Sequence, residues 1–339
     1  MRVLHVSNFT VKWDGNHFYG IPYKLNNGLT RLGHHVFSLC DRDIADSYLL
    51  GLRRAGRGYA NRKLLRVCEQ VRPDLLLLGL CTLIRPETIS SVRAVLPGLR
   101  IAHWNCDPLF DPPNLKRLKL LAPLVDATFV TTAGDTLKSI VESGGRVAFM
   151  PNPVDRSVES LRVFETADLK TELVFMGNPD RSRTAICDHI RSRLPELNFE
   201  IRGTSGMPGA YGADAFDLLG RSKMGLSLSR RNDVFLYSSD RMSMMMGCGL
   251  LTFLDRKTGF DSLFGEDEIA FYEDLDDLVT KIRRFAADEG QRIDIARRGW
   301  RKAHEIFSET LVAQWIIDAT FGSPGTNSYV WPMQIHGAN

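Results

Sequence analysis

The chain has 339 residues, a length that normally forms about two domains. Hydrophobic residues make up 44% of it and charged residues 24%, a globular composition that excludes disorder as its main state. The net charge is only +3. It therefore gives no reason to expect nucleic acid as a partner, although it suits anionic ligands or an anionic membrane surface.

The chain lacks the usual signals for membrane insertion, secretion and metal binding. Its longest aliphatic run, residues 75–80, is far shorter than the roughly 20 residues of a membrane helix. The first ten residues lack the long apolar core of a signal peptide. The six cysteines are scattered without a CxxC pair or a Cys/His cluster, which indicates neither disulfides nor a metal site. We therefore expect a cytoplasmic protein with reduced thiols.

The first half alternates between strand-like and helix-like segments. Strands are expected at residues 3–7, 36–40, 74–79, 100–104, 127–131 and 147–150. Helices are expected at residues 23–32, 49–71, 86–96, 114–121 and 134–143. The run 74–79 is apolar, as in a central parallel strand covered on both faces. This alternation predicts an α/β fold with a parallel sheet and right-handed crossovers, which is a Rossmann-like layer.

A turn is predicted at residues 151–155, PNPVD, because two prolines in three residues interrupt any helix or strand. The alternation then restarts, with strands at 173–176, 199–202, 224–228, 250–254 and 269–271, and helices at 181–194, 213–221, 241–246, 275–287, 292–307 and 309–320. We expect two Rossmann-like domains, residues 1–150 and 151–320, and a tail, 321–339. Ligands of parallel sheets bind beyond the carboxyl ends of the strands, so a cleft between the domains is the expected site.

Two loops of the first half carry candidate catalytic groups. The loop 8–20 contains Asp14 and His17, an acid and an imidazole suited to acceptor binding or general base catalysis. It has no GxGxxG spacing, which argues against a dinucleotide cofactor. Residues 103–108, HWNCDP, place Asp107 at a strand end. The alternatives are a loop that only covers the sheet, and an Asp107 that only starts a turn or caps the next helix.

One strand-to-helix junction of the second half suits a phosphate group. Residues 176–183, MGNPDRSR, place Gly177 and Asn178 at a strand end, where a glycine lets a ligand approach the backbone. Arg181 and Arg183 add cationic groups at the helix N-terminus, whose free N–H groups and dipole attract anions. The alternative is that both arginines are solvated first-turn residues.

A second junction lies at residues 229–249, SRRNDVFLYSSDRMSMMMGCG. Arg230 follows a strand end, and Ser239 and Asp240 are good N-cap residues for a helix that carries Arg241 and Ser243. This helix N-terminus would also suit a diphosphate. The methionines of the helix favour core packing over a ligand site.

A basic helical face is expected in the first half. It comprises Arg53, Arg54, Arg57, Arg62, Lys63 and Arg66, with Lys116, Arg117 and Lys119 on a second helix. Such a face is commonly solvated, and the alternative is contact with anionic lipid at a membrane surface. Aromatic residues are not interleaved with these charges, which argues against nucleic acid.

Five segments in order carry a resemblance to a known family: WNCDP at 104–108, PNPVD at 151–155, LVFMGNPDRSR at 173–183, DRMSMMMGCGLLTFLDRKTGFDSLF at 240–264, and the closing helices at 274–316. With these segments the chain resembles the GT-B glycosyltransferases, and its second half looks most like the CgeB-like (spore maturation protein-like) branch related to glycosyltransferase family 4. The resemblance implies a nucleotide-sugar donor held by the second domain and an acceptor held by the first.

The resemblance also implies roles for particular residues. Gly177 with Arg181 or Arg183 would contact the diphosphate, Arg202 and Gly203 would border the nucleobase, and residues 240–246 would place a helix N-terminus near the phosphates. The sequence departs from the family at Met244, where the family has a glutamate that binds the ribose or donor hydroxyls. Either ribose recognition differs from that of the family, or neighbours such as Asp240 or Ser243 supply it.

The resemblance leaves the catalytic group and the stereochemistry open. A base for an inverting mechanism would be Asp14, His17 or Asp107. GT-B enzymes bind their donor without a metal on a DxD motif, because a helix dipole and basic groups offset the charge of the leaving group. No cofactor or metal is therefore expected.

These features predict a glycosyltransferase that moves a hexosyl or related group from a nucleotide-sugar to a surface glycan, a lipopolysaccharide, a glycolipid or a protein. It would act in the cytoplasm or at the inner face of the membrane. The alternatives are an epimerase or phosphorylase of the same fold, and a non-catalytic nucleotide-sugar-binding protein. An epimerase would be expected to carry more cleft carboxylates and histidines. The absence of the glutamate at position 244 keeps the binding protein as an alternative.

Overall fold

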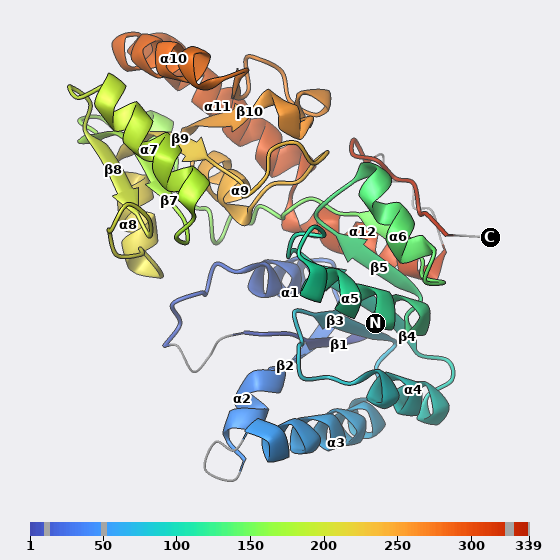
Figure 1. Ribbon diagram of the computed structural model, residues 1–339. Helices are drawn as coiled ribbons and strands as arrows, with labels where there is room; N and C mark the ends of the chain where they lie inside the picture. The colour runs from blue at the N-terminus through green and yellow to red at the C-terminus, as the bar shows by residue number, and fades with distance from the viewer. Residues whose placement is uncertain (10–13, 49–52, 323–328, 338–339) are drawn as a thin grey trace. The chain divides into compact units, whose positions relative to one another are not determined.

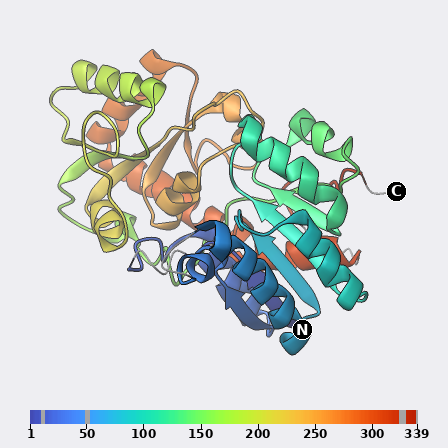
Figure 2. The ribbon, with the colours of Figure 1, turned by 60° about the horizontal axis from the view of Figure 1, so that its bottom comes forward.

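The computed structural model describes residues 1–9, 14–48, 53–322 and 329–337. They form two compact units, one of Met1–Pro151 with Glu309–Asn339 and one of Asn152–Ser308. Each unit contains one parallel β-sheet with helices packed on it (Figures 1 and 2). The two predicted Rossmann-like layers are confirmed.

The sheet of the first unit has six strands in the order β2-β1-β3-β4-β5-β6. Their bounds are β1 Arg2–Val6, β2 His35–Leu39, β3 Leu75–Gly79, β4 Arg100–Asn105, β5 Ala127–Val130 and β6 Val147–Phe149. The helices are α1 Ile21–Arg31, α2 Asp41–Asp46, α3 Arg53–Val71, α4 Pro86–Val95, α5 Pro112–Leu121 and α6 Lys138–Val141. The apolar strand β3 is buried along its whole length, as expected for a strand with neighbours on both sides and helices on both faces.

The helix α12, Glu309–Phe321, belongs to the first unit, although the sequence pattern assigns it to the second. It packs on α1, and the close approach of the two helices requires a glycine at position 28. A Cβ on Gly28 would lie 2.2 Å from the carbonyl oxygen of Glu309. Arg31 pairs with the Glu309 carboxylate at 2.5 Å, and the Trp315 indole donates to the carbonyl of Phe149 at 2.9 Å. These long-range contacts decide where the helix folds.

The C-terminal segment closes the edge of the first sheet. His336 and Val147 exchange backbone hydrogen bonds of 2.9 and 3.0 Å as an antiparallel bridge beside β6. Tyr329 is buried against Trp315, and its hydroxyl donates to Asp318 at 2.7 Å. The described part of the tail is therefore anchored to α12 and to an exposed strand edge.

The sheet of the second unit has five strands in the order β11-β10-β9-β7-β8. Their bounds are β7 Thr171–Met176, β8 Phe199–Arg202, β9 Ser222–Ser227, β10 Leu251–Asp255 and β11 Ala270–Tyr272. The helices are α7 Arg181–Arg193, α8 Ala213–Gly220, α9 Asp240–Gly247, α10 Leu275–Ala287 and α11 Glu289–Ile306. One apolar cluster joins the sheet to α7, α10 and α11. Strand ends and helix starts therefore alternate along the carboxyl edge of the sheet, where ligands of such folds bind.

The proline-containing turn at 151–155 starts the second unit. Its Val154 N–H donates to the carbonyl of Phe307 at 2.7 Å, and the Asn152 carbonyl accepts from the Ser243 hydroxyl at 2.9 Å. The turn is thus held by two later segments of the second unit, α9 and the residue after α11. Within the described residues, no helix combines the length and apolarity needed to cross a membrane.

Candidate functional site

The candidate donor site lies at the carboxyl edge of the second sheet, where β7, β8 and β9 end. Gly177 follows β7, and its N–H donates to the carbonyl of Arg202, the last residue of β8, at 3.0 Å. The next residue, Gly203, has φ +76°. This edge therefore brings together Gly177, Arg202 and Gly203, as the sequence predicts.

The two glycines are required by close packing within the protein. A Cβ on Gly203 would lie 2.0 Å from the carbonyl oxygen of Gly177, and a Cβ on Gly177 would lie 2.5 Å from Nη2 of Arg241. The sequence pattern assigns the space at Gly177 to a ligand. In the structure this space is occupied by the guanidinium of Arg241, which extends from α9 to the end of β7.

Arg241 joins three elements at this edge. Its guanidinium donates to the carbonyl of Met176 at the end of β7, to the carbonyl of Leu228 after β9 at 2.7 Å, and to the Ser239 hydroxyl at 3.1 Å. It also lies 4.8 Å from the centre of the Phe175 ring. Burial lowers its pKa to about 9, and the nearby charge of Arg183 acts in the same direction. The guanidinium of Arg241 therefore holds the strand ends together by its hydrogen bonds, and these donors are not available to a ligand.

Arg183 is the cation most suited to an anion. It lies in the first turn of α7 and is 5% exposed. One nitrogen, Nη1, donates to the carbonyl of Asn178 at 3.4 Å, whereas the buried Nε has no hydrogen-bond partner within the described part of the chain. Burial lowers the pKa of Arg183, and the nearby charge of Arg230 acts in the same direction. The charges of Asp180 and Tyr237 raise this pKa and only partly offset the effect of burial. A buried guanidinium with an unused donor destabilises the empty site, so an anion there would stabilise it.

The two helix N-termini at this edge differ. Asp180 caps α7, since its carboxylate accepts from the N–H groups of Ser182 at 3.0 Å and Arg183 at 3.3 Å. These N–H groups are therefore already used, contrary to the expectation from the sequence. The N-cap residue of α9, Ser239, makes no such bond, because its hydroxyl accepts from Arg241 instead. Among the described residues, the N-terminus of α9 thus has no side-chain cap, and the dipole of the helix favours an anion there.

The remaining predicted donor-site residues separate into exposed and buried ones. Arg181, Asn178 and Arg230 are exposed, and Asp240 is partly exposed at the start of α9. Ser243 is 2% exposed, and its hydroxyl donates to the backbone of Asn152. The prediction that Ser243 could replace the missing glutamate is therefore wrong, because α9 turns it toward the proline-containing turn.

Several oxygens at this edge were not predicted from the sequence. They are buried, have no hydrogen-bond partner among residues 1–9, 14–48, 53–322 and 329–337, and belong to Asn152, Ser227, Ser229 and Asn232. Ser227 and Ser229 flank the end of β9, and Asn232 donates its amide to Asp255 at the end of β10 at 3.0 Å. In the sequence, the only feature that could have predicted these oxygens as ligand contacts is the presence of polar residues at and after the end of a strand. Buried acceptors without partners favour a ligand with hydroxyl groups.

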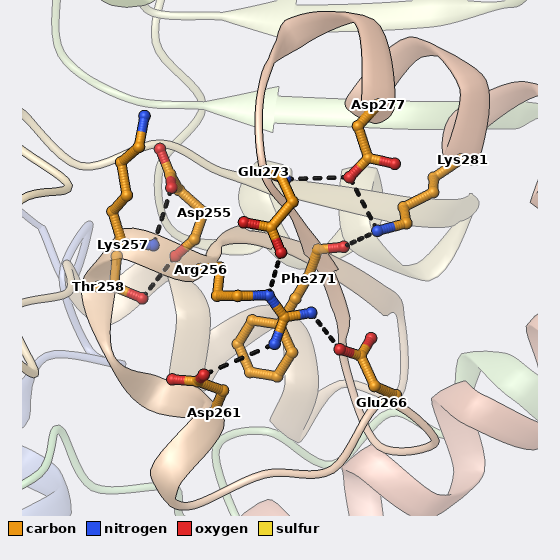
Figure 3. A network of polar contacts seen from close by, with 10 residues as sticks. All are labelled: Asp255, Arg256, Lys257, Thr258, Asp261, Glu266, Phe271, Glu273, Asp277 and Lys281. Carbon is orange, nitrogen blue, oxygen red and sulfur yellow. Dashed lines mark hydrogen bonds and ion pairs between the residues drawn. The ribbon is translucent and has the colours of Figure 1, made fainter.

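The loop after β10 is fixed by an ion-pair network (Figure 3). Arg256 donates to Glu266 and Glu273, lies 3.6 Å from a carboxylate oxygen of Asp261, and stacks 5.1 Å from the Phe271 ring centre. The hydrogen bonds that Arg256 donates to Glu266 and Glu273 raise its pKa. This network holds residues 256–266 against β11 and so positions the neighbouring Asp255, which accepts from Asn232.

In the first unit, Asp107 lies in a turn at the end of β4. Its N–H donates to Oδ1 of Asn105 at 2.9 Å, and its carbonyl accepts from Asn114 at 3.0 Å, while its side chain is exposed. The cap of α5 is Asp111, which accepts from the N–H of Asn114 at 3.3 Å. The alternative in which Asp107 caps this helix is therefore excluded.

Asp14 and His17 share one turn of the loop after β1, of which residues 10–13 lie outside the described residues. Asp14 has φ +53° and Gly15 φ +80°, and the His17 carbonyl accepts from Gly20 at 2.9 Å. The His17 ring lies 5.9 Å from that of Tyr19, and burial lowers its pKa. A neutral imidazole at neutral pH is the form that accepts a proton.

A buried polar chain supports the same edge of the first sheet. The Trp104 indole donates to Nε2 of His5 at 3.0 Å, and His5 Nδ1 lies 2.6 Å from Oδ1 of Asn26. Because Nε2 accepts, the proton of the neutral ring is on Nδ1 and is donated to Asn26. Asn26 in turn donates to the Ser38 hydroxyl at 2.7 Å. Burial lowers the pKa of His5 to about 4, against a partial rise from the Asn26 hydrogen bond.

This chain predicts a pH dependence of the first unit. His5 has the ordinary histidine pKa of 6.5 in the unfolded state and a pKa of about 4 in the folded state. Between these two pH values the unfolded state is protonated at His5 and the folded state is not, so protonation favours unfolding. The free energy of unfolding is expected to fall by about 3 kcal/mol between pH 6.5 and 4 from this group. Hydrogen exchange of β1 and β4, compared with His5→Gln, measures it. An equal pH slope in the variant would contradict this assignment.

Solved structures with the same fold cover almost the whole chain. The sucrose-phosphate synthase of Thermosynechococcus elongatus has 12% identity and a TM-score of 0.59, over 94% of this chain and 98% of that one. HepE of Anabaena, in complex with UDP and glucose, has 11% identity and a TM-score of 0.59, over 95% and 100%. A UDP-N-acetylglucosamine 2-epimerase has 9% identity and a TM-score of 0.54, over 94% and 95%. Identities this low establish the shared fold alone.

The chain thus has the fold of the GT-B glycosyltransferases, with two Rossmann-like units of six and five parallel strands. Residues 181–316 match the model of a family described as glycosyl transferase-like. The match begins at α7, with Arg181 and Arg183, and ends within α12. No curated protein matches the sequence significantly.

Proposed function

We propose that the protein is a glycosyltransferase of the CgeB-like branch that takes its sugar from a nucleoside-diphosphate donor. The observation that carries this proposal is the buried Arg183, whose Nε lacks a partner, beside the uncapped N-terminus of α9. Both features attract a diphosphate. The family match of residues 181–316 supports sugar transfer, and HepE, which shares the fold, has been solved in complex with UDP and with UDP-glucose.

The donor would be held by the second unit. The diphosphate would contact Arg183 and the N–H groups of α9, with Arg181 and Arg230 as outer cations. The nucleobase would lie beside Arg202 and Gly203. Asp240, with the unpaired oxygens of Ser229 and Asn232, would accept hydroxyl groups of the ribose or the sugar.

In the proposed reaction an acceptor hydroxyl oxygen forms a bond to the anomeric carbon. The bond from that carbon to the β-phosphate oxygen breaks, and the nucleoside diphosphate leaves. The cations and the helix dipole stabilise the charge that develops on the leaving oxygen, so neither a metal nor another cofactor is needed. The acceptor proton passes to a base, for which Asp107, Asp14 and His17 are the candidates.

The acceptor would be a surface glycan, a lipopolysaccharide, a glycolipid or a protein. Arg62, Lys63 and Arg66 are exposed on α3, and this basic face would let the enzyme touch an anionic membrane surface at the cytoplasmic side. Residues 49–52 of the predicted helix, and the side chains of residues 53 and 54, lie outside the described part of the chain.

The proposed function is tested by measuring thermal stability with the diphosphates of uridine, guanosine, adenosine and thymidine. A stabilising nucleotide raises the free energy of unfolding by about 2.7 kcal/mol at a hundredfold excess over Kd. The corresponding nucleotide-sugars are then assayed for hydrolysis and transfer. The absence of any shift would refute the proposal, binding without turnover would favour a binding protein, and isomerised donor would favour the epimerase.

Asp107→Asn is expected to lower kcat by about 100-fold with little change in nucleotide affinity, because the amide cannot accept the proton of the acceptor hydroxyl. The exposed side chain makes a folding defect small. Titration calorimetry and initial rates separate the two quantities, with Asp111→Asn as the control on the same loop. Unchanged kcat would leave Asp14 or His17 as the base, and lost affinity would move Asp107 out of the catalytic role.

A further inference from the structure

A pocket of about 370 Å³ opens in the second unit between the end of β8 and α8. Figure 1 shows α8 beside the end of β8. The wall of the pocket includes two arginines, two aspartates, a proline and a glycine: Arg202, Arg221, Asp214, Asp217, Pro208 and Gly209. The volume is sufficient for a nucleobase with part of its ribose, and the wall offers both hydrogen-bond donors and acceptors.

Backbone hydrogen bonds join the wall of the pocket to the strand ends of the candidate diphosphate site. Arg202 lines the pocket, and its carbonyl accepts from the N–H of Gly177. Gly203 donates to the carbonyl of Pro208, another wall residue, at 3.0 Å. A ligand whose phosphates lie at the ends of β7 and α9 would therefore extend its base toward this pocket.

The donor groups of the wall are held in place. Glu200 accepts from Arg202 at 3.1 Å and from Arg221 at 3.0 Å, so one carboxylate orients both guanidinium groups. Arg202 uses only Nη2 in this pair. Its other nitrogens remain available to a carbonyl oxygen or a ring nitrogen of a ligand.

The acceptor groups differ from each other. Asp214, in the first turn of α8, has no hydrogen-bond or ion-pair partner among the described residues. Asp217 lies one turn further on, near Arg221, whose pKa is raised by Glu200 and also by Asp217. Asp214 is therefore the carboxylate whose two oxygens remain for a ligand.

We infer that this pocket selects guanine as the base of the nucleoside-diphosphate donor, through Asp214 and Arg202. Guanine presents two adjacent N–H groups, N1–H and the 2-amino group, that match the two oxygens of one carboxylate. Its O6 and N7 match a guanidinium. Uracil offers one N–H between two carbonyl oxygens, and adenine presents an acceptor at N1. This inference rests on the proposed function and names its donor class.

The test is a calorimetric titration of the whole protein with GDP, IDP, UDP and ADP. IDP differs from GDP only in lacking the 2-amino group, so one carboxylate contact is removed without a mutation. GDP is expected to bind about tenfold more tightly than IDP, and about tenfold or more above UDP and ADP. Equal affinities for GDP and IDP would overturn the inference.

Asp214→Asn provides the second arm. Its amide N–H₂ faces the 2-amino group of guanine but suits the 2-carbonyl of xanthine, so the preference should move from GDP toward XDP by about tenfold. Asp217→Asn is the matched control on the same helix and should keep the ratio of GDP to IDP affinity. An unchanged preference in Asp214→Asn would overturn the role of that residue.

The two proposals fail differently. Binding of UDP in preference to GDP would refute guanine selection and leave sugar transfer intact. Failure of every nucleoside diphosphate to bind would refute both. GDP binding that discriminates against IDP, with transfer from a GDP-sugar, would support both.

Discussion

Arg183→Met is expected to weaken nucleoside diphosphate binding by about 100-fold, because charge-assisted hydrogen bonds to a phosphate are lost. The side chain is 5% exposed, and its Nε has no partner among the residues that the structure describes. Removing a buried guanidinium that makes one long hydrogen bond and leaves Nε without a partner should therefore change the free energy of unfolding by no more than about 1 kcal/mol. Titration calorimetry with the nucleotide and denaturant unfolding without it measure the two effects.

Arg181→Met is the matched control in the same turn of α7. Arg181 is exposed, so its loss should change affinity by about threefold or less. Equal losses in both variants would mean that the two arginines act through general electrostatic attraction. A large loss of stability with unchanged affinity in Arg183→Met would show that Arg183 serves folding and would remove the main support for the diphosphate site.

Gly203→Ala should be the most destabilising single change at the site, by about 3–5 kcal/mol. The new Cβ would lie 2.0 Å from the carbonyl oxygen of Gly177, and the backbone at φ +76° is already unfavourable for alanine. Relief requires β7 and β8 to separate at the edge that carries the donor site. We therefore expect nucleotide binding to be lost together with stability. Hydrogen exchange of β7 and β8 reports on the strand ends directly.

Gly206→Ala separates the cost of backbone strain at a positive φ from the cost of the steric contact between residues 203 and 177. Gly206 also has a positive φ, +75°, but a Cβ there would meet nothing within 4 Å. It should cost only the backbone term of about 1 kcal/mol and leave nucleotide affinity intact. Similar losses in both variants would mean that backbone strain, and not the contact between Gly203 and Gly177, governs this edge.

Much of the architecture could be predicted from the sequence because its causes are local. The run 75–79 is apolar at every position except its last glycine, and β3 is buried along its length. The prolines of 151–155 interrupt regular structure, and the boundary between the two units falls there. Arginines in the first turn of the helix after a strand marked the region of Arg183 as a candidate diphosphate site.

The roles of individual side chains depended on contacts that no local pattern encodes. Arg241 resembled a ligand-binding residue in the sequence, yet the ends of β7 and β9 surround it and use its donors. Ser243 resembled a replacement for the missing glutamate, but its position on α9 turns it toward Asn152. The His5–Trp104 hydrogen bond joins residues 99 positions apart and left no signal in either segment.

The sequence by itself therefore determined the two alternating α/β units, the turn between them and the strand ends at which a ligand would bind, because hydrophobic periodicity and proline act over a few residues. Only the tertiary structure decided that α12 folds onto α1, which Arg31 and Glu309 join across 278 positions. It also decided which polar groups remain without a protein partner. The physical reason is that burial and hydrogen-bond satisfaction are set by whichever distant segments the fold brings into contact.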